Sequence, residues 1–234
     1  MERTGVIIVA GGGGRRMGGT LPKQFRLLGG RPVLARTIDA FAAALPGAEI
    51  VVVLPESHVG FWRDFAARFD VAEHHIAVGG AERFHSVKNG LAQLGDGPEL
   101  IAVQDAARPL VTATLIRRTA EAAREYGAAV PVVEPVDSLR ETDGTGSRPV
   151  DRRRLRIVQT PQIFRAGLLR GAYEAEYREE FTDDASVVER TGHPIALCEG
   201  ERSNLKLTTP EDMAIAEALL AAREDTDEQH GEKL

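Results

Sequence analysis

Short apolar segments alternate along the chain with longer segments whose apolar residues recur every three or four positions. The short segments are rich in valine, isoleucine and alanine, as is typical of buried parallel strands; they are Val6–Ala10, Glu49–Leu54, Ile76–Val78, Leu100–Gln104 and Ala128–Val133. The segments with helical spacing are Val33–Leu45, Val59–Phe69, Arg83–Leu94 and Ala113–Tyr126. This alternation predicts an α/β protein with a doubly wound, Rossmann-like and mostly parallel sheet that has helices on both faces.

The alternation stops between Glu134 and Phe164. Two stretches that look extended, "VDSLRET" and "RPVDRRRLRIVQT", flank the sequence "DGTGS", whose composition is typical of a hairpin turn. We expect an inserted β-hairpin arm over residues 134–160, with few local neighbours to bury it. Such an arm either folds back over the functional face of the sheet or reaches another subunit.

The remaining part of the chain is predicted to complete the same domain. It should add a helix at Ala166–Tyr177, a short strand at Ile195–Cys198 and a last helix from about Pro210 to Arg223. The final sequence "EDTDEQHGEKL" is charged and has no apolar anchor, which is typical of a disordered tail. We therefore expect one domain over residues 1–224, which includes the arm, and a disordered tail over residues 225–234.

Two loops at the expected carboxyl ends of strands carry candidate chemistry, and ligands bind at such ends in open α/β sheets. In the first, "AGGGGRRMGGTLPKQF", consecutive glycines let backbone N–H groups face a phosphate. Arg15, Arg16 and Lys23 add the positive charge that a triphosphate needs. The spacing fits neither the dinucleotide fingerprint nor a Walker P-loop. A flexible loop whose arginines only contact solvent is the alternative.

The second loop is "QDAARP", from Gln104 to Pro109. Asp105, at the end of a strand, can hold Mg²⁺, and Arg108 can bind a second anion. An Asp–Arg pair that only stabilises the loop explains the same residues equally well.

Composition and charge exclude several classes of protein. The 234 residues carry a net charge of -6, which argues against a general nucleic-acid partner even though "RRRLR" (Arg152–Arg156) is a basic cluster. A single cysteine, Cys198, excludes an internal disulfide framework and a cysteine-rich metal site. No apolar run approaches the ~18 residues of a membrane span, and the first strand begins too early to leave room for a leader. We therefore expect a cytoplasmic protein with no membrane partner.

Taken together, the motifs resemble those of a known enzyme family. "AGGGGRRMGGTLPKQF", "GGAERFHSV", "VQDAARPLV", "PVDSL", "TPQIF", "FTDDAS" and "NLKLTTPEDM" have the order and spacing found in methylerythritol phosphate cytidylyltransferases, from about Thr4 to Ala222. The resemblance implies a fold of the nucleotidyltransferase type, a homodimer formed through the β-arm, and a divalent cation, Mg²⁺, as cofactor. It also implies transfer of CMP from CTP to the phosphate of 2-C-methyl-D-erythritol 4-phosphate in non-mevalonate isoprenoid synthesis, with release of pyrophosphate.

The resemblance further implies roles for individual residues. The implied catalytic residues are Arg16, Lys23 and Lys206, which act on the phosphates at the reacting centre. The implied CTP-binding positions are Ala10, Gly11, Gly12 and Gly14 around the triphosphate, and Gly80 and Ser86 near the cytosine and ribose. The implied acceptor-side positions are Asp105, which also holds the metal, Arg108, Ser138, Thr182 and, from the arm of the other subunit, Arg152. Ala81 replaces an acidic residue that many relatives carry, so one base contact of the family is not expected here.

Two other functions remain open from the sequence alone. Ribitol phosphate cytidylyltransferases share almost every one of these motifs. A nucleotide-binding regulator without turnover is the alternative outside catalysis, and the joint presence of Arg16, Lys23, Asp105 and Lys206 argues against it.

Overall fold

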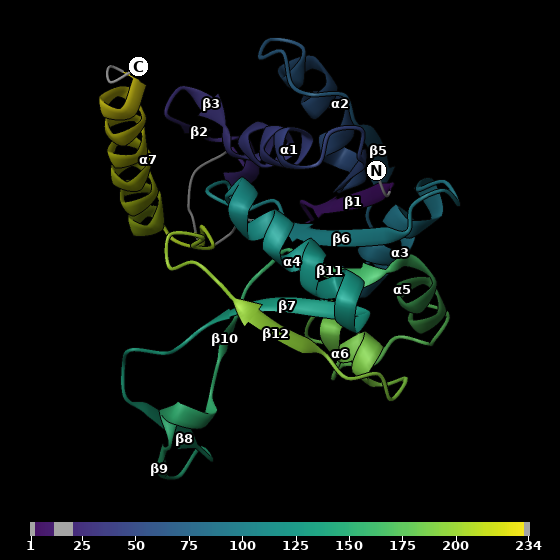
Figure 1. The fold of residues 1–234 in the computed structure, drawn as a ribbon, viewed down its shortest axis with the longest axis vertical. Coiled ribbons are helices and arrows are strands. Elements are labelled where there is room, and N and C mark those ends of the chain that lie inside the picture. The colour runs from purple at the N-terminus through teal and green to yellow at the C-terminus, as the bar shows by residue number, and fades with distance from the viewer. Residues whose placement is uncertain (1–2, 12–20, 232–234) are drawn as a thin grey trace.

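The computed structural model of the chain describes residues 3–11 and 21–231. Within them, a central eight-stranded sheet has helices on both faces (Figure 1). The order along the sheet is β10-β7-β11-β6-β1-β4-β5, and β12 pairs with β7. All pairings are parallel except those of β10 and β11, which are antiparallel. The expected mostly parallel α/β architecture is therefore confirmed.

The strands and helices predicted from the hydrophobic pattern lie close to their expected positions. The strands are β1 (Thr4–Val9), β4 (Glu49–Leu54), β5 (His75–Val78), β6 (Leu100–Asp105) and β7 (Ala128–Val133). The helices between them are α1 (Val33–Ala44), α2 (Glu56–Ala66), α3 (Arg83–Gln93) and α4 (Ala113–Tyr126). Local chemistry sets the ends of α4, since the Thr112 hydroxyl accepts a hydrogen bond from the Leu115 amide and Gly127 ends the helix at a φ of 88°.

The core lies in two layers on either side of the sheet, and β1 contributes to both. Val6 and Ile8 pack toward the side chains of α1, α2 and α4, whereas Ile7 packs toward α3 and toward two later helices, α5 (Ala166–Ala172) and α6 (Asp184–Glu189). All three β1 side chains are fully buried. This explains why the strand shows a continuous apolar run rather than an alternating pattern.

Several elements in the second half of the chain differ from the prediction. β11 (Gln162–Arg165) runs antiparallel between β6 and β7 in the middle of the sheet, and the sequence analysis did not identify it as a strand. β10 (Ile157–Val158) precedes it along the same edge of β7. The other edge of β7 is covered by β12 (Ala196–Glu199), which lies within one residue of the strand predicted at Ile195–Cys198. α5 ends at Ala172 rather than at Tyr177, and the short α6 was not expected.

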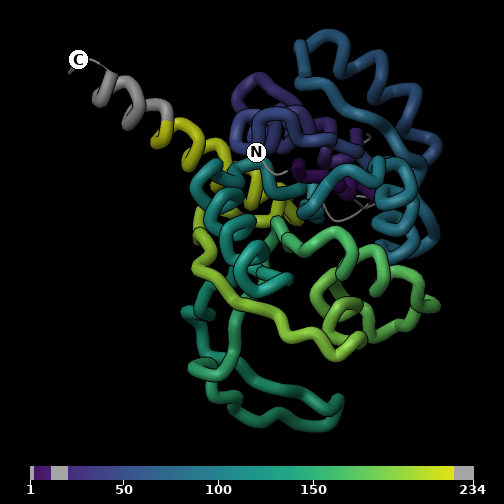
Figure 2. The backbone as a smooth tube through the Cα atoms, turned by 45° about the vertical axis from the view of Figure 1, so that its right-hand side comes forward, coloured from purple at the N-terminus to yellow at the C-terminus, as the bar shows by residue number. Residues whose placement is uncertain are grey.

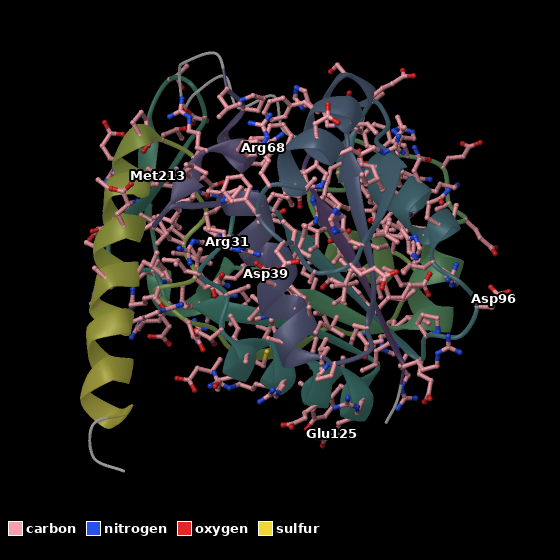
Figure 3. All side chains as sticks on the ribbon, turned by 90° about the horizontal axis from the view of Figure 1, so that it is seen from above. Arg31, Asp39, Arg68, Asp96, Glu125 and Met213 are labelled. Atoms are coloured by element: carbon pink, nitrogen blue, oxygen red, sulfur yellow. The ribbon has the colours of Figure 1, made fainter. Side chains whose placement is uncertain are left out.

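The last helix, α7 (Pro210–Gly231), is longer than the sequence indicates. It continues through residues 225–231, where the sequence predicts a disordered tail. Closer to its start, Met213 and Ala216 belong to a small apolar cluster with Leu28, Val33 and Leu207. Figure 3 shows α7 along one side of the molecule, with Met213 labelled on it.

Two short elements follow the glycine-rich segment. β2 (Leu27–Leu28) and β3 (Arg31–Pro32) form a small hairpin before α1. Arg31 pairs with Asp39 of α1, with 2.5 Å between Nη2 and Oδ2, and donates a second hydrogen bond to the carbonyl oxygen of Phe69 (2.6 Å) (Figure 3). These bonds hold the hairpin against α1 and the end of the α2 segment.

A second hairpin is formed by β8 (Leu139–Thr142) and β9 (Ser147–Val150), which pair antiparallel around the Asp143–Gly146 turn. The Asp143 carboxylate accepts hydrogen bonds from the amides of Thr145 and Gly146, and these bonds lower the pKa of Asp143. Figures 1 and 2 show this hairpin extending away from the sheet. No helix in the described parts of the chain is long and apolar enough to cross a membrane.

Candidate active site

A pocket of about 250 Å³ lies at the carboxyl ends of β1 and β6. The two strands end together because Val9 pairs with Asp105 in parallel register. The pocket brings together residues predicted from distant parts of the sequence: Ala10, Gly11, Lys23, Gly80, Ser86, Asp105 and Lys206. Gly12, Gly14 and Arg16 lie outside the described residues, so the structure says nothing about their predicted roles.

Asp105 is the acidic centre of this pocket, and three cations surround it. Lys206 Nζ lies 2.8 Å from Oδ2, Arg108 Nε 3.6 Å from the same oxygen, and Arg83 Nε 3.8 Å from Oδ1. Burial by itself raises the pKa of Asp105, but the positive charges of Arg83, Lys206 and Arg108 outweigh it and lower the pKa. Asp105 is therefore a carboxylate at neutral pH.

Arg108 is held beside the pocket rather than in its lining. Its Nη1 donates to the backbone oxygen of Asn204 (2.7 Å), and the Asn204 amide group donates to the carbonyl oxygen of Thr160 (2.9 Å). Burial lowers the pKa of Arg108 and the Asp105 carboxylate opposes this effect; the guanidinium stays charged at any physiological pH. Arg108 thus joins Asp105 to the segment that carries Lys206.

Lys23 contacts the same segment. It begins a 3₁₀ turn at Lys23–Phe25, and its Nζ donates to the carbonyl oxygen of Leu207 (2.9 Å). The Leu207 amide in turn donates to the carbonyl oxygen of Ala107 (2.8 Å), and Gln24 Nε2 donates to that of Ala10 (3.1 Å). These backbone contacts bring two predicted lysines, Lys23 and Lys206, to one edge of the sheet.

The loop before α3 forms another wall of the pocket. Ser86 Oγ accepts a hydrogen bond from the Gly80 amide (3.1 Å) and donates one to the carbonyl oxygen of Glu82 (3.2 Å). A Cβ at Gly80 would overlap the side chain of His85, so a glycine is required for the close approach of the loop to α3. Gly80, Ala81, Glu82, Arg83 and Ser86 form this wall.

The other predicted residues lie elsewhere in the described structure. Ser138 and Arg152 are exposed at the base of the hairpin, where Arg152 Nη1 donates to the carbonyl oxygen of Val136. Thr182 is exposed directly before α6. None of these three lines the pocket within the described parts of the chain. Their predicted contacts with an acceptor therefore stay predictions.

Arg83, which no sequence pattern singled out, also lines the pocket. Its guanidinium donates two hydrogen bonds to the buried Asp184, of 2.9 Å and 2.7 Å, and Tyr173 Oη donates a third to the same carboxylate (2.6 Å). Burial lowers the pKa of Arg83, but Asp184, Asp105 and Tyr173 together raise it above its ordinary value. The "GGAERFHSV" motif indicated that the loop is functional. The local sequence, however, cannot show that Arg83 pairs with a buried acid from another part of the chain.

Among the residues that the structure describes, the Asp105 carboxylate lies beside the cations of Arg83, Arg108 and Lys206, and Lys23 and Glu82 also line the pocket. Such an arrangement suits two phosphorylated ligands that must be held close together. It contains the charge needed for phosphoryl transfer and does not depend on a protein nucleophile.

Comparison with known proteins identifies the family. The family model described as 2-C-methyl-D-erythritol 4-phosphate cytidylyltransferase matches residues 4–222. The relative of that name from Phocaeicola vulgatus is 49% identical over 216 residues, which cover 92% of this chain and 98% of the relative. The one from Geobacillus kaustophilus is 41% identical over 221 residues, covering 93% of this chain and 96% of the relative.

Solved structures agree with the sequence comparison. The crystal structure of 2-C-methyl-D-erythritol 4-phosphate cytidylyltransferase from Thermus thermophilus has a TM-score of 0.73 and 35% identity, with 94% of this chain and 100% of that chain covered. The 4-diphosphocytidyl-2C-methyl-D-erythritol synthase from Anaerococcus prevotii has a TM-score of 0.79 and 27% identity, covering 94% of this chain and 99% of that one. The resemblance inferred from the motifs is thus confirmed, and the chain belongs to the 2-C-methyl-D-erythritol 4-phosphate cytidylyltransferase family of nucleotidyltransferases.

Proposed function

We propose that this protein transfers CMP from CTP to the phosphate of 2-C-methyl-D-erythritol 4-phosphate and releases pyrophosphate, as a step of non-mevalonate isoprenoid synthesis. Family membership supports this reaction, since the relatives carry the name of that activity. One structural observation carries the proposal: Lys23, Asp105 and Lys206, which are far apart in sequence, meet in a single pocket at the strand ends. A ribitol phosphate acceptor and a regulator without turnover are not favoured.

The reaction needs little covalent help from the protein. The acceptor phosphate is already a nucleophile near neutral pH; its oxygen forms a bond to the α-phosphorus of CTP as the bond to pyrophosphate breaks. The difficulty is to bring two polyanions together in line and to stabilise the charge at the reacting phosphorus. Lys23, Lys206 and Arg16 are the residues to which we assign this stabilisation.

A divalent cation fits the donor chemistry of the pocket. Asp105 is an ionised carboxylate at its edge, and Mg²⁺ in nucleotide enzymes is commonly held by one or two carboxylates together with substrate phosphates. We propose that Asp105 holds the ion when CTP is bound. The ion would neutralise phosphate charge, while the lysines orient the two substrates.

For the nucleotide, we assign the triphosphate to the backbone of Ala10, Gly11, Gly12 and Gly14. The cytosine and ribose would lie against Gly80 and Ser86, which line the pocket. Arg108, Ser138 and Thr182 are assigned to the acceptor. We place the reaction in the cytoplasm, where nucleoside triphosphates are available.

The arm suggests a homodimer. Val136, Leu139, Ile157 and Val158 are large apolar residues of the arm and its base that are between 36% and 61% exposed. A second copy that covers them would bury apolar surface, and isologous two-fold dimers are the commonest assembly. We propose that such a dimer brings Arg152 of one subunit to the acceptor phosphate in the site of the other.

The proposed function is tested by measuring pyrophosphate release from CTP with either polyol phosphate, with and without Mg²⁺. Turnover that requires Mg²⁺ and prefers 2-C-methyl-D-erythritol 4-phosphate supports it. Equal or faster turnover with ribitol 5-phosphate would assign the chain to that acceptor instead.

A further inference from the structure

Arg83 lies between two carboxylates that belong to different parts of the fold. It is the first residue of α3. On one side its Nη1 and Nη2 donate to the two oxygens of Asp184 at 2.9 Å and 2.7 Å; on the other side its Nε faces Asp105 Oδ1 at 3.8 Å. The guanidinium therefore connects the pocket, through Asp105, with the start of α6, through Asp184.

The pairing with Asp184 fixes the orientation of the guanidinium. Asp184 is fully buried, and a buried carboxylate without a cationic partner is strongly unfavourable. Two parallel N–H···O bonds also allow only one arrangement of the planar guanidinium, which a single ammonium group cannot reproduce. With both Nη atoms used in this way, only the Nε edge of Arg83 is directed at Asp105.

The anchor itself is rigid because a central strand holds it. Gln162 of β11 is buried, and it donates to Asp183 Oδ2 (2.8 Å) and accepts from the Ala185 amide (2.8 Å). These two residues flank Asp184 at the start of α6. Next to Arg83, the Phe84 ring stacks on Tyr173 with centroids 4.7 Å apart, and Tyr173 is the residue whose hydroxyl also binds Asp184. The start of α3 and the start of α6 therefore form one packed unit.

The two oxygens of Asp105 face different cations. Arg83 faces Oδ1, whereas Lys206 and Arg108 face Oδ2. We propose that Arg83 is a positioning residue for nucleotidyl transfer: anchored by Asp184, it holds the Asp105 carboxylate in the orientation that the reaction uses. This inference rests on the proposed function and extends it to Asp184 and Tyr173, neither of which lines the pocket.

The Arg83–Asp184 contact also links the residues assigned to the nucleotide with those assigned to the acceptor. Arg83 directly follows the Gly80–Glu82 loop, which we assign to the nucleotide, and Asp184 follows Thr182, which we assign to the acceptor, by two residues. The pair therefore joins two loops that are 101 residues apart in sequence. Breaking it should affect CTP and the acceptor together.

The test compares kinetic constants in three variants: Arg83→Lys, Asp184→Asn and the double variant. Arg83→Lys keeps the charge but loses the double hydrogen bond; Asp184→Asn keeps the shape of the acid but removes its charge. Each should lower kcat/KM about 10-fold to 10²-fold, the usual effect of slightly misplaced catalytic groups. The double variant should be about as active as the weaker single variant, because both substitutions break the same contact. Effects that multiply in the double variant would overturn the proposal.

A matched control separates positioning from general stability. Arg170 binds the other end of α3, where its guanidinium donates to the carbonyl oxygens of Leu91, Leu94 and Gly95 at 2.8–3.1 Å. Arg170→Lys should lower the midpoint of thermal unfolding and leave kcat and both KM values unchanged. If Asp184→Asn behaves like Arg170→Lys, the role of Asp184 is only structural and the proposal fails.

Two further measurements test the proposal even if one of these variants does not fold, or if the wild-type protein shows no turnover. Tyr173→Phe removes a single hydrogen bond to Asp184 and should lower kcat/KM severalfold with little loss of folded protein; unchanged kinetics would contradict the anchor. Amide hydrogen exchange in the free protein needs no turnover: Asp184→Asn should speed exchange at Gly80–Glu82, and no change there overturns the coupling. If wild type lacks transferase activity while this exchange responds, the proposed function fails and the coupling stands.

Discussion

Replacing Lys206 with methionine separates a chemical role of this lysine from a structural one. Lys206 Nζ lies 2.8 Å from Asp105 Oδ2, but its side chain is 48% exposed, so solvent screens the attraction. An exposed pair of this kind contributes about 0.2–1 kcal/mol to the free energy of unfolding. Asp105 keeps Arg83 and Arg108 as neighbours when Lys206 is removed, so no unpaired buried charge is left behind.

The expected effect on catalysis is much larger. Removing one donor that stabilises transition-state charge typically costs about 10²–10³ in kcat, or about 2.7–4 kcal/mol. Lys206→Met should therefore lower kcat at least ~10²-fold, while the midpoint of thermal unfolding falls by no more than about 4 °C, the shift expected for ~1 kcal/mol in a domain of this size. Methionine has a similar length, so packing is largely retained.

Steady-state pyrophosphate release and thermal unfolding of the same preparations measure both quantities. Arg118→Met is the matched control: this arginine of α4 lies 3.8 Å from Glu199 Oε2 in an exposed pair remote from the pocket. The control should show a similar small loss of stability and an unchanged kcat. If Lys206→Met keeps kcat and only raises KM, Lys206 supplies ground-state binding, and its assignment as a catalytic residue is refuted.

Three other outcomes follow from the site. Lys23→Ala should lower kcat at least ~10²-fold with a smaller effect on CTP binding; a near-normal kcat with a raised KM would contradict this. Inactive Arg152→Ala and Lys206→Ala homodimers, when mixed and allowed to exchange, should recover roughly a quarter of wild-type activity, since half the dimers are mixed and one site in each is intact. No recovery in a verified mixed dimer would exclude a shared site. Because neighbouring cations lower the pKa of Asp105, its ionised form stabilises the fold above the ordinary aspartate value of about 3.9, and this stability is lost as the pH falls through the lower folded-state pKa. Asp105→Asn should thus lose less stability than wild type below about pH 4, and equal losses would contradict the lowered pKa.

The sequence predicts the parallel half of the sheet well because each strand there is a continuous apolar run. β1, β4 and β6 are buried on both faces, so apolar residues fill most of their length. β11 could not be found in this way, since it pairs with Leu100–Val103 and Ala128–Ala129, which are far away in sequence. Its place in the sheet is decided by tertiary contacts rather than by a local pattern.

The same limit applies to the candidate site. Asp105 lies at the end of one predicted strand, and Lys23 lies in the loop that follows another. The order of the motifs therefore predicts that the two residues meet at the strand ends. The adjacent acids Asp183 and Asp184 look equivalent in sequence, yet Asp183 caps α6 with a hydrogen bond from the Ser186 amide (2.9 Å) while Asp184 is fully buried against Arg83. Only the packing of α6 against α3 distinguishes them.

The most direct test of the proposed function is the specificity of pyrophosphate release by the wild-type protein. With CTP, Mg²⁺ and 2-C-methyl-D-erythritol 4-phosphate, we expect turnover that is abolished by a chelator, and much less turnover when ribitol 5-phosphate replaces the acceptor or when ATP, GTP or UTP replaces CTP. Comparable turnover with ribitol 5-phosphate, or none with any polyol phosphate, would contradict the account.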